Sequence, residues 1–530
     1  MNVLESLTRR ALEQPELVAH EWRGRTLTFA QLWSRATALG TALERSLGDS
    51  REPVVVFGHK HPDMLTCMLA CLLTGHPYVP VDSSLPADRV RSILTASAAG
   101  LVLAPEDADR IGETPPGTVV WESADLERVC SPPTASDASD GSDAGSSSPG
   151  APRATAPDEA QYIIFTSGST GTPKGVQIAR SSVDRFTGWL VDLVSGHVAF
   201  EGRRQATVIN QAPFSFDLSV MDLMLAWATG SRLVHIDRDH ILRLADLFTT
   251  LAESDADAWV STPSFADLCL ASDEFNETLL PHLRIFLFCG ETLPHATAAR
   301  LRERFPSAAV INTYGPTEST VAVTSIKVDE QVLRDHPTLP VGATKPGSVI
   351  LILGPDGSPL PEGEKGEIVI GGDTVSMGYY RRDDLTERAF ARIDTPAYTG
   401  WAYRTGDAGF QRDGQLFFAG RLDFQVKLHG YRIEIEDIEA NLRELPGVLQ
   451  AVVVPRYAVD SPTTVTSLHA VVQPTELPTG STLSATVALK RVLRERLPDY
   501  MIPKTMSFVA EIPMTPNGKA DRAAVAAMTA

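Results

Sequence analysis

Short apolar runs alternate with helix-like segments along much of this chain, and this alternation restricts its fold more than any other feature. Before residue 131 the apolar runs include Pro53–Phe57 and Leu101–Ala104, and the same alternation returns from Thr207 to Thr324. Strands separated in this way by helices are typical of parallel sheets with crossover connections. The pattern therefore predicts an α/β protein built from parallel subdomains.

The pattern changes between Gly347 and Gly420, where short strands such as Gly366–Gly372 are separated by glycine turns. This stretch predicts a β-rich subdomain. After Arg421, short strands and helices follow one another again, with Leu449–Pro455 and His469–Val472 as strand candidates. At 530 residues the chain is too long for one compact unit. We expect a large N-terminal domain, residues 1–422, and a small α+β C-terminal domain, residues 423–530.

One segment differs in composition from the rest of the chain. Residues 131–157 consist mostly of Ser, Pro, Ala, Gly and Asp, with hardly any large apolar side chain. Such a segment cannot bury enough surface to offset the entropy lost on ordering. We expect a flexible surface insertion here.

Charge and cysteine content exclude several classes of protein. The chain carries 66 acidic and 47 basic side chains, a net charge of −19, which argues against nucleic acid or membrane insertion as its main role. The N-terminus has no signal-peptide pattern, and the most apolar helical run, Met64–Thr74, is too short to cross a bilayer. Five cysteines without a CxxC pair favour neither a disulfide framework nor a zinc site. A cytoplasmic location is expected.

The stretch Thr166–Gly175, TSGSTGTPKG, is the clearest chemical signal in the chain. It follows the buried-strand pattern Tyr162–Phe165 and combines three glycines with hydroxyl side chains and one lysine, Lys174. Glycines allow close approach of the backbone, and hydroxyl and N–H groups can surround phosphate oxygens. The chain contains no GxxxxGK[ST], GxGxxG, GxSxG or HExxH pattern, so the usual kinase-like, dinucleotide, serine-hydrolase and zinc-protease signatures are absent.

Further motifs extend this signal over nearly the whole chain. They are Asn312–Glu318 (NTYGPTE), Tyr403–Asp407 (YRTGD), Gly420–Asp423 (GRLD) and Asn517–Lys519 (NGK). In this order and spacing, together with the loop above, they resemble the adenylate-forming superfamily. That superfamily includes acyl-CoA synthetases, luciferase-like enzymes and amino-acid adenylation domains. The resemblance implies an ATP-dependent ligase with two domains joined by a hinge.

The resemblance also implies roles for individual residues. Glu318 would hold Mg²⁺ against the phosphates of ATP, Tyr314 would stack on adenine, and Asp407 would accept the ribose hydroxyls. Lys519 would neutralise charge as a carboxylate attacks the α-phosphate. The residues assigned to ATP are Thr166, Ser167, Gly168, Thr170, Lys174, Tyr314, Thr317, Asp407 and Arg421.

Each of these residues also has a plainer interpretation. Tyr314 could be a buried core tyrosine, Glu318 a helix cap, and Asp407 a turn residue before Gly409. An isolated lysine such as Lys519 is usually a solvated charge.

Asp217 indicates which acid is activated. Amino-acid-adenylating members of the family place an aspartate after an aromatic residue, and here Phe216 precedes Asp217. A carboxylate in a partly apolar pocket needs a partner, which a substrate ammonium supplies. Asp217 could instead cap a helix that begins at Leu218.

The resemblance assigns an apolar pocket without a second charge, which disfavours a basic or acidic substrate side chain. The bulk of Leu218 and Met221 favours a small one. Local stretches such as FSFDLSVMD and FLFCGETLP look most like the D-alanine–carrier protein ligases. Cys289 would contact the substrate Cα or methyl group, or it could simply be a small buried hydrophobe. Val260 departs from the threonine expected in those ligases. The substrate-binding residues assigned are Asp217, Leu218, Met221, Val260, Leu287, Cys289, Thr313, Val321 and Ala322.

The resemblance also implies residues for a second half-reaction, the transfer of the aminoacyl group. Asp423 would be the hinge residue, and Lys427 and Gly430 would face the adenylate and a phosphopantetheine tunnel after domain rotation. A surface ion pair is the alternative for Lys427. No carrier module with its attachment serine follows the C-terminal domain, so a separate acyl or peptidyl carrier protein is the expected partner.

The predicted function is thus ATP-dependent adenylation of a small amino acid, most simply alanine, and transfer to a carrier protein thiol or to an aminoacyl group on that carrier. An acyl-CoA synthetase acting on a small carboxylic acid is the alternative, and Asp217 argues against it. A catalytically silent scaffold is disfavoured by the complete set Lys174, Glu318, Asp407 and Lys519. The enantiomer, the carrier and the pathway, whether cell-wall or antibiotic biosynthesis, stay open.

Overall fold

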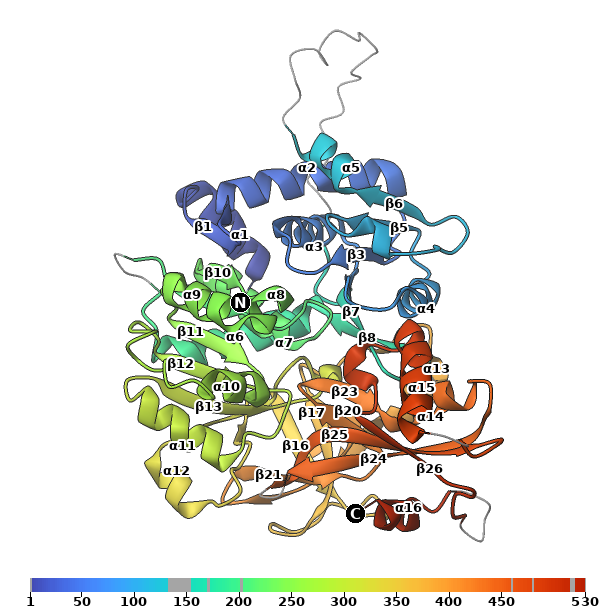
Figure 1. The fold of residues 1–530 in the computed structure, drawn as a ribbon. Helices are drawn as coiled ribbons and strands as arrows, with labels where there is room; N and C mark the ends of the chain where they lie inside the picture. The colour runs from blue at the N-terminus through green and yellow to red at the C-terminus, as the bar shows by residue number, and fades with distance from the viewer. Residues whose placement is uncertain are drawn as a thin grey trace.

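The computed structural model describes residues 2–131, 154–168, 172–200, 204–458, 461–478, 481–514 and 520–529. Within these ranges the chain forms two large mixed sheets, a smaller antiparallel sheet and two small sheets near the C-terminus (Figure 1). The α/β prediction, with its β-rich region and α+β C-terminal part, is confirmed.

The first large sheet has seven strands in the described residues, in the order β18-β8-β7-β4-β3-β5-β6. Strands β3 to β7 run parallel, and β7 pairs antiparallel with β8 through the predicted phosphate loop. The strands are β3 (Val54–Gly58), β4 (Tyr78–Asp82), β5 (Leu101–Ala104), β6 (Val119–Glu122), β7 (Ala160–Thr166), β8 (Lys174–Ala179) and β18 (Gly378–Tyr379).

The second large sheet has nine strands in the same ranges, in the order β15-β14-β13-β12-β11-β9-β10-β1-β2. Its central strands are parallel, and antiparallel strands flank them at both edges. The strands are β1 (Val18–Trp22), β2 (Arg25–Thr28), β9 (Thr207–Asn210), β10 (Arg232–His235), β11 (Ala258–Ser261), β12 (Ile285–Phe288), β13 (Ala309–Tyr314), β14 (Thr324–Lys327) and β15 (Ala343–Thr344).

Helices of the N-terminal part connect and cover these strands. Helix α7 is buried along its whole length and shares one hydrophobic core with α3, α6 and strands of both large sheets. An all-round apolar sequence such as LSVMDLMLAWAT is what a fully buried helix requires. The helices are α1 (Val3–Glu13), α2 (Phe29–Leu47), α3 (Pro62–Thr74), α4 (Ala87–Ser97), α5 (Ser123–Cys130), α6 (Arg180–Ser195), α7 (Leu218–Thr229), α8 (Arg238–Leu242), α9 (Leu244–Ser254), α10 (Pro263–Leu270), α11 (His295–Arg304), α12 (Glu330–Asp335) and α13 (Asp383–Ala389).

The β-rich stretch forms an antiparallel sheet in the order β16-β17-β20-β19, with β21 paired to β20. Its long strand β20 carries the YRTGD motif and places Asp407 opposite Arg421. The strands are β16 (Ser348–Leu353), β17 (Gly366–Gly372), β19 (Phe390–Thr395), β20 (Tyr398–Arg412) and β21 (Gln415–Arg421).

A separate hydrophobic cluster begins at Val426, just after the predicted boundary. In Figure 1 the red elements of this region lie at the lower right, with α15 next to α4 of the N-terminal part. The boundary at residue 423 itself stays a prediction. The elements are β22 (Gln425–Leu428), β23 (Tyr431–Glu434), α14 (Ile435–Arg443), β24 (Val448–Ala458), β25 (Ser461–Pro474), α15 (Thr482–Arg496), β26 (Thr505–Phe508) and α16 (Arg522–Met528).

Most of the predicted insertion, residues 132–153, lies outside the described residues. Its C-terminal end is wrongly included, because Thr155 is fully buried. The Thr155 backbone N–H donates to the Leu72 carbonyl of α3 at 3.0 Å. The surface segment therefore ends before Thr155, where an anchor under α3 begins.

The five cysteines are free and buried, and Cys67 and Cys71 pack within α3 as expected. Among the helices of the described ranges, none is long and apolar enough to cross a membrane.

Candidate active site

Asp217 lies at the wall of a small cavity that is lined by loops of the nine-stranded sheet, by β20 and β21 of the antiparallel sheet, and by the β22–β23 hairpin. It directly precedes α7, and the loop from β9 carries it there. Asp217 stands at the N-cap position of α7, but its carboxylate makes no capping hydrogen bond. Burial raises the pKa of Asp217 to about 6, although a hydrogen bond from Thr317 and the charge of Lys427 oppose the shift. The capping alternative therefore does not describe this side chain.

The cavity beside Asp217 has a volume of about 30 Å³. Of the nine predicted substrate-binding residues, four line it: Asp217, Leu218, Cys289 and Val321. The other five are buried in the structure without lining this cavity, and their role stays a prediction. They are Met221, Val260, Leu287, Thr313 and Ala322.

The backbone beside this cavity is strained. Thr320 and Val321 adopt left-handed conformations with φ of 61° and 65°, which β-branched residues rarely do. The Cys289 thiol donates to the Val321 carbonyl at 3.4 Å, and burial raises the pKa of that thiol. Strain of this kind persists where surrounding contacts enforce it, and it is frequent at functional sites.

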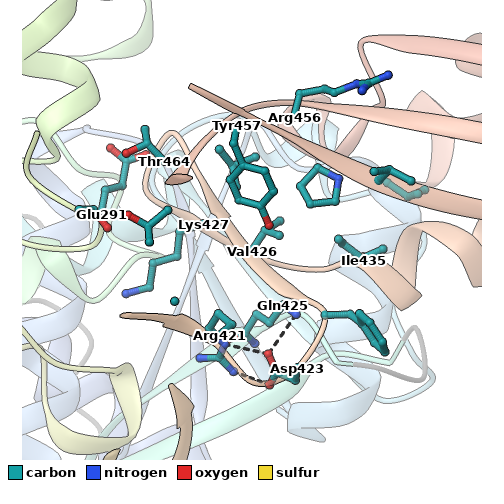
Figure 2. Close-up of a pocket in the computed structure, with 18 of the residues that line it drawn as sticks. Glu291, Arg421, Asp423, Gln425, Val426, Lys427, Ile435, Arg456, Tyr457 and Thr464 are labelled. Carbon is teal, nitrogen blue, oxygen red and sulfur yellow. Dashed lines mark hydrogen bonds and ion pairs between the residues drawn. The ribbon is translucent and has the colours of Figure 1, made fainter. Parts of the chain in front are cut away.

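The predicted nucleotide residues form a connected polar group. The Tyr314 hydroxyl donates to Asp407 at 2.6 Å, and Arg421 donates to the other Asp407 oxygen at 2.7 Å. Arg421 also donates to both oxygens of Asp423, a contact drawn with dashed lines in Figure 2. Asp407 thus lies in a strand rather than a turn. Its ion-pair partner Arg421 is also one of the residues assigned to ATP from the sequence.

Glu318 is fully buried and has two partners that the sequence analysis did not identify. Arg432 donates to both of its carboxylate oxygens at 2.8 and 2.6 Å, and the Tyr379 hydroxyl donates at 2.7 Å. Burial alone would raise the pKa of Glu318, but the charges of Arg432 and Lys174 outweigh it and lower the pKa to about 2. Arg432 lies shortly after Lys427 and Gly430, which the sequence analysis had assigned to the site, so this arginine could have been considered with them. Tyr379 belongs to no motif.

The phosphate loop also contacts the C-terminal part. The Ser167 hydroxyl donates to the Arg432 carbonyl at 2.9 Å and accepts from the Glu434 backbone N–H at 3.1 Å. A Cβ on Gly168 would lie 2.2 Å from the Thr172 carbonyl oxygen, so this position requires glycine. The Thr166 hydroxyl is buried and has no hydrogen-bond partner among the described residues. Thr170 lies outside the described residues.

Lys174 follows the loop at the start of β8, opposite Thr166. Its ammonium lies 3.7 Å from a Glu434 oxygen and 4.9 Å from the centre of the Tyr379 ring. Burial, followed by repulsion from Arg432, lowers the pKa of Lys174 to about 8. Lys174 is therefore a buried cation beside the ionised Glu318.

The β22–β23 hairpin brings Lys427 and Gly430 to the same place. The Gly430 N–H donates to Glu291 at 2.7 Å, and a Cβ on Gly430 would lie 2.4 Å from the Thr262 methyl carbon. Lys427 is half-buried, with its ammonium 6.0 Å from the centre of the Tyr314 ring. It lines the cavity rather than an open surface. Lys519 falls within residues 515–519, outside the described part of the chain.

Three larger cavities meet the small one through shared lining residues. A cavity of about 450 Å³, shown in Figure 2, shares Arg421 and Lys427 with it, and one of about 390 Å³ shares Arg432 and reaches Lys174. A third, of about 730 Å³, shares Phe216 and opens between the N-terminal part and Tyr431. The Asp217 cavity thus shares parts of its wall with three larger cavities.

The fit of Mg²⁺ to this site depends on Arg432. No cluster of three or more His, Cys, Asp or Glu side chains that could hold a metal occurs among the described residues. Glu318 offers one ionised carboxylate, which suits a cation that also binds substrate phosphates. Because Arg432 occupies both oxygens, the carboxylate fits Mg²⁺ only after Arg432 has withdrawn.

Comparison with known proteins gives matches over almost the whole chain. A family model described as AMP-binding enzyme matches residues 7–380, and one described as AMP-binding enzyme C-terminal domain matches residues 437–519. A D-alanine–D-alanyl carrier protein ligase of Bacillus cereus is 45% identical over 525 residues, which is 98% of each chain. The protein of the same name from Bacillus mycoides is 45% identical over 522 residues, again 98% of each chain.

Solved structures share the fold. An NRPS protein containing adenylation and PCP domains, bound to a vinylsulfonamide inhibitor, superposes with a TM-score of 0.77 at 26% identity. That match covers 99% of this chain and 84% of the other. An adenylation domain of Vibrio cholerae, in complex with glycyl-adenosine-5'-phosphate, has a TM-score of 0.77 at 21% identity. It covers 100% and 98% of the two chains and supports the fold alone.

Proposed function

This chain belongs to the AMP-binding enzyme family of adenylate-forming ligases, and on that premise we propose that it activates a small amino acid, first of all alanine, and transfers it to a separate carrier protein. The reaction uses ATP in the first step and releases pyrophosphate and then AMP. The D-alanine ligases among its relatives make D-alanine the first enantiomer to test.

The observation that carries this proposal is the buried Asp217 carboxylate. It faces a cavity that Leu218, Cys289 and Val321 also line, and burial raises its pKa although the charges of Lys427 and Arg432 oppose the shift. A carboxylate held in such surroundings is costly unless a cation pairs with it. The ammonium of an amino acid is such a cation.

In the first step a carboxylate oxygen of the amino acid attacks the α-phosphorus of ATP, and pyrophosphate leaves. Lys174 neutralises charge on the phosphates, because it lies buried beside the phosphate loop. Asp407 and Arg421 hold the ribose, with Tyr314 against the adenine. Lys519 neutralises the charge that develops during attack; this assignment rests on the motif alone.

Glu318 is the proposed magnesium ligand in this step, and the ion would screen the phosphate charges while it is bound. The bidentate contact of Arg432 with Glu318 supports a division of the cycle into two arrangements. In one, Glu318 faces the metal and the phosphates. In the other, after pyrophosphate has left, Arg432 takes that carboxylate and the β22–β23 hairpin closes on the site.

In the second step the thiolate of a phosphopantetheine arm attacks the acyl carbon of the adenylate, and AMP leaves. The cavity of about 730 Å³ is the proposed entrance for the arm, since it leads from the surface to Phe216 and Tyr431 beside Gly430. Lys427 lies close enough to Tyr314 to meet the adenylate. We assign the rotation between the two arrangements to a hinge at Asp423, between domains 1–422 and 423–530.

ATP–pyrophosphate exchange with D-alanine, L-alanine, glycine, valine and propionate tests the proposal. We expect alanine to support exchange far better than propionate, and a phosphopantetheine-bearing carrier protein to accept the aminoacyl group in preference to coenzyme A. Exchange driven equally well by propionate, with transfer to coenzyme A, would instead establish the acyl-CoA synthetase alternative. Buffer without amino acid is the background control.

A further inference from the structure

Lys60 is a fully buried lysine with no place in the reaction described above. It lies after β3 and is 0% exposed. A buried ammonium is stable only when each of its donors is occupied and an opposite charge is near. Its partners therefore indicate what it holds in place.

The partners of Lys60 all come from one stretch of chain. Its Nζ donates to the Asn210 side-chain oxygen and to the Ala212 carbonyl, and it lies 4.5 Å from the centre of the Phe214 ring. Asn210 is the last residue of β9, and Ala212 and Phe214 belong to the loop that follows. That loop leads directly to Phe216 and Asp217.

The same group of contacts continues into the helix after Asp217. Asn210 Nδ2 donates to Asp222 Oδ1 at 2.7 Å, and Asp222 is a fully buried residue of α7. The other Asp222 oxygen has no hydrogen-bond partner. Burial lowers the pKa of Lys60 to about 8, and the charge of Asp222 opposes that shift. Lys60 thus holds the chain before Asp217 directly and is linked to the helix after it through Asn210.

Two buried histidines lie beside this group of contacts. His235 Nδ1 lies 2.9 Å from the Asn210 oxygen, and burial lowers the pKa of His235 well below its ordinary value. Burial also lowers the pKa of His20, the neighbouring ring, to about 3. Neither histidine can replace the positive charge of Lys60.

We propose that Lys60 is a positioning residue for amino-acid recognition, which holds the Asn210–Asp222 segment so that Asp217 faces the substrate ammonium. This inference rests on the proposed role of Asp217. Lys60 touches neither nucleotide nor amino acid, and it acts through the loop. Displacement of a recognition group by about 1 Å can cost about 100-fold in rate.

The test compares Lys60→Met with Lys345→Met in pyrophosphate exchange. Lys345 is a second buried lysine, paired with Asp373 at 2.8 Å, and it contacts no residue of the Asn210–Asp222 segment. We expect Lys60→Met to lower the kcat/KM for alanine about 10- to 100-fold, mainly through KM, while the KM for ATP changes less than about twofold. The ratio of kcat/KM for alanine to kcat/KM for propionate should fall as well. Lys345→Met should lower thermal stability and leave that ratio intact.

The double variant Lys60→Met/Asp222→Asn separates positioning from stability. Removing both charges should restore much of the melting temperature, because no unpaired buried charge is left. The loop has still lost its ammonium donor, so the alanine-to-propionate ratio should stay low. A ratio that recovers with the melting temperature would overturn the proposal, and this variant decides the matter if Lys60→Met does not fold. Absence of amino-acid-dependent exchange in the unaltered protein would instead refute the proposed function.

Discussion

At the scale of single residues, the site depends on two buried carboxylates with opposite behaviour. Burial raises the pKa of Asp217, whereas Arg432 and Lys174 overcome the same effect at Glu318. In the proposed function, the Asp217 carboxylate receives the substrate ammonium, whereas Glu318 exchanges Arg432 for the metal.

Replacing Asp217 by Ala should affect substrates according to their charge. Breaking a buried ion pair by removing one partner costs ~3–5 kcal/mol, or two to three decades in kcat/KM. Alanine should lose this much in pyrophosphate exchange, whereas propionate, which has no ammonium, should be used poorly by both proteins. If the ratio between the two substrates stays the same, Asp217 does not bind the amine.

The pH dependence of kcat/KM should report the titration of Asp217. Only the ionised carboxylate attracts the ammonium, and burial places its pKa at about 6 in the free protein. The kcat/KM for alanine should therefore fall as the pH decreases through about 6. The limb in kcat should lie at lower pH, because bound ammonium favours the ionised form. Asp217→Asn should lack the limb; its persistence there would assign it to another group.

At the scale of elements, two features lead to predictions: the β22–β23 hairpin, and the anchor at Thr155, which the deletions below test. The hairpin inserts Gly430 where a side chain would strike Thr262 and approach Phe216. The φ of 83° at Gly430 adds a backbone reason for glycine. The close contact with Thr262 and the positive φ of Gly430 both occur with the hairpin docked over the site.

Gly430→Leu should separate the two half-reactions. The new side chain cannot fit against Thr262 when the hairpin is docked, so transfer to the carrier should fall at least tenfold. Pyrophosphate exchange should stay within a few-fold, because adenylation uses the other arrangement. Equal loss of both activities would show that the docked hairpin is needed for adenylation too.

Two deletions test the insertion. Replacing residues 132–153 by a short Gly/Ser linker should leave exchange within a few-fold, given the composition of that segment. Extending the deletion through Pro157 removes buried Thr155 and its hydrogen bond to Leu72, and should lower thermal stability measurably. A large loss of stability from the shorter deletion would mean that the insertion packs against the protein.

At the scale of the whole molecule, the C-terminal part is held over the site by several polar contacts. Besides Arg432 with Glu318, these include Ser167 with the β23 backbone and Arg89 of α4 with Asp437 of α14 at 3.3 Å. Each contact joins residues that are far apart in the sequence. Their loss would release the C-terminal part as a unit.

Lys519→Ala should impair only adenylation, the half-reaction assigned to the arrangement in which Arg432 has withdrawn from Glu318. A donor that acts on transition-state charge is commonly worth ~10²–10³ in rate, so exchange should nearly cease while ATP affinity changes little. Transfer from chemically prepared alanyl-adenylate to the carrier should continue, because the proposed role of Lys519 is confined to the charge that develops during adenylation. Near-normal exchange would remove Lys519 from the mechanism.

Much of this protein could be predicted from its sequence, because the determining signals are local. The period of the apolar runs gave the parallel sheets, and glycine spacing gave the β-rich region. The phosphate loop and the YRTGD motif were recognisable as motifs. Asp217 stood out because the resemblance implies an aspartate after an aromatic residue in members that adenylate amino acids.

The tertiary structure decided which groups meet. Arg432 on Glu318, Lys60 on the loop before Asp217, and Thr155 under α3 are contacts between segments separated by tens to hundreds of residues. Local propensity carries no information about such pairs, because their free energy appears only when the chain has folded and water has been excluded. Exclusion of water raises the pKa of both Asp217 and Glu318, and at Glu318 the charges of Arg432 and Lys174 reverse that shift. The sequence determined which chemistry is available, and burial with its long-range partners decided where each charge acts.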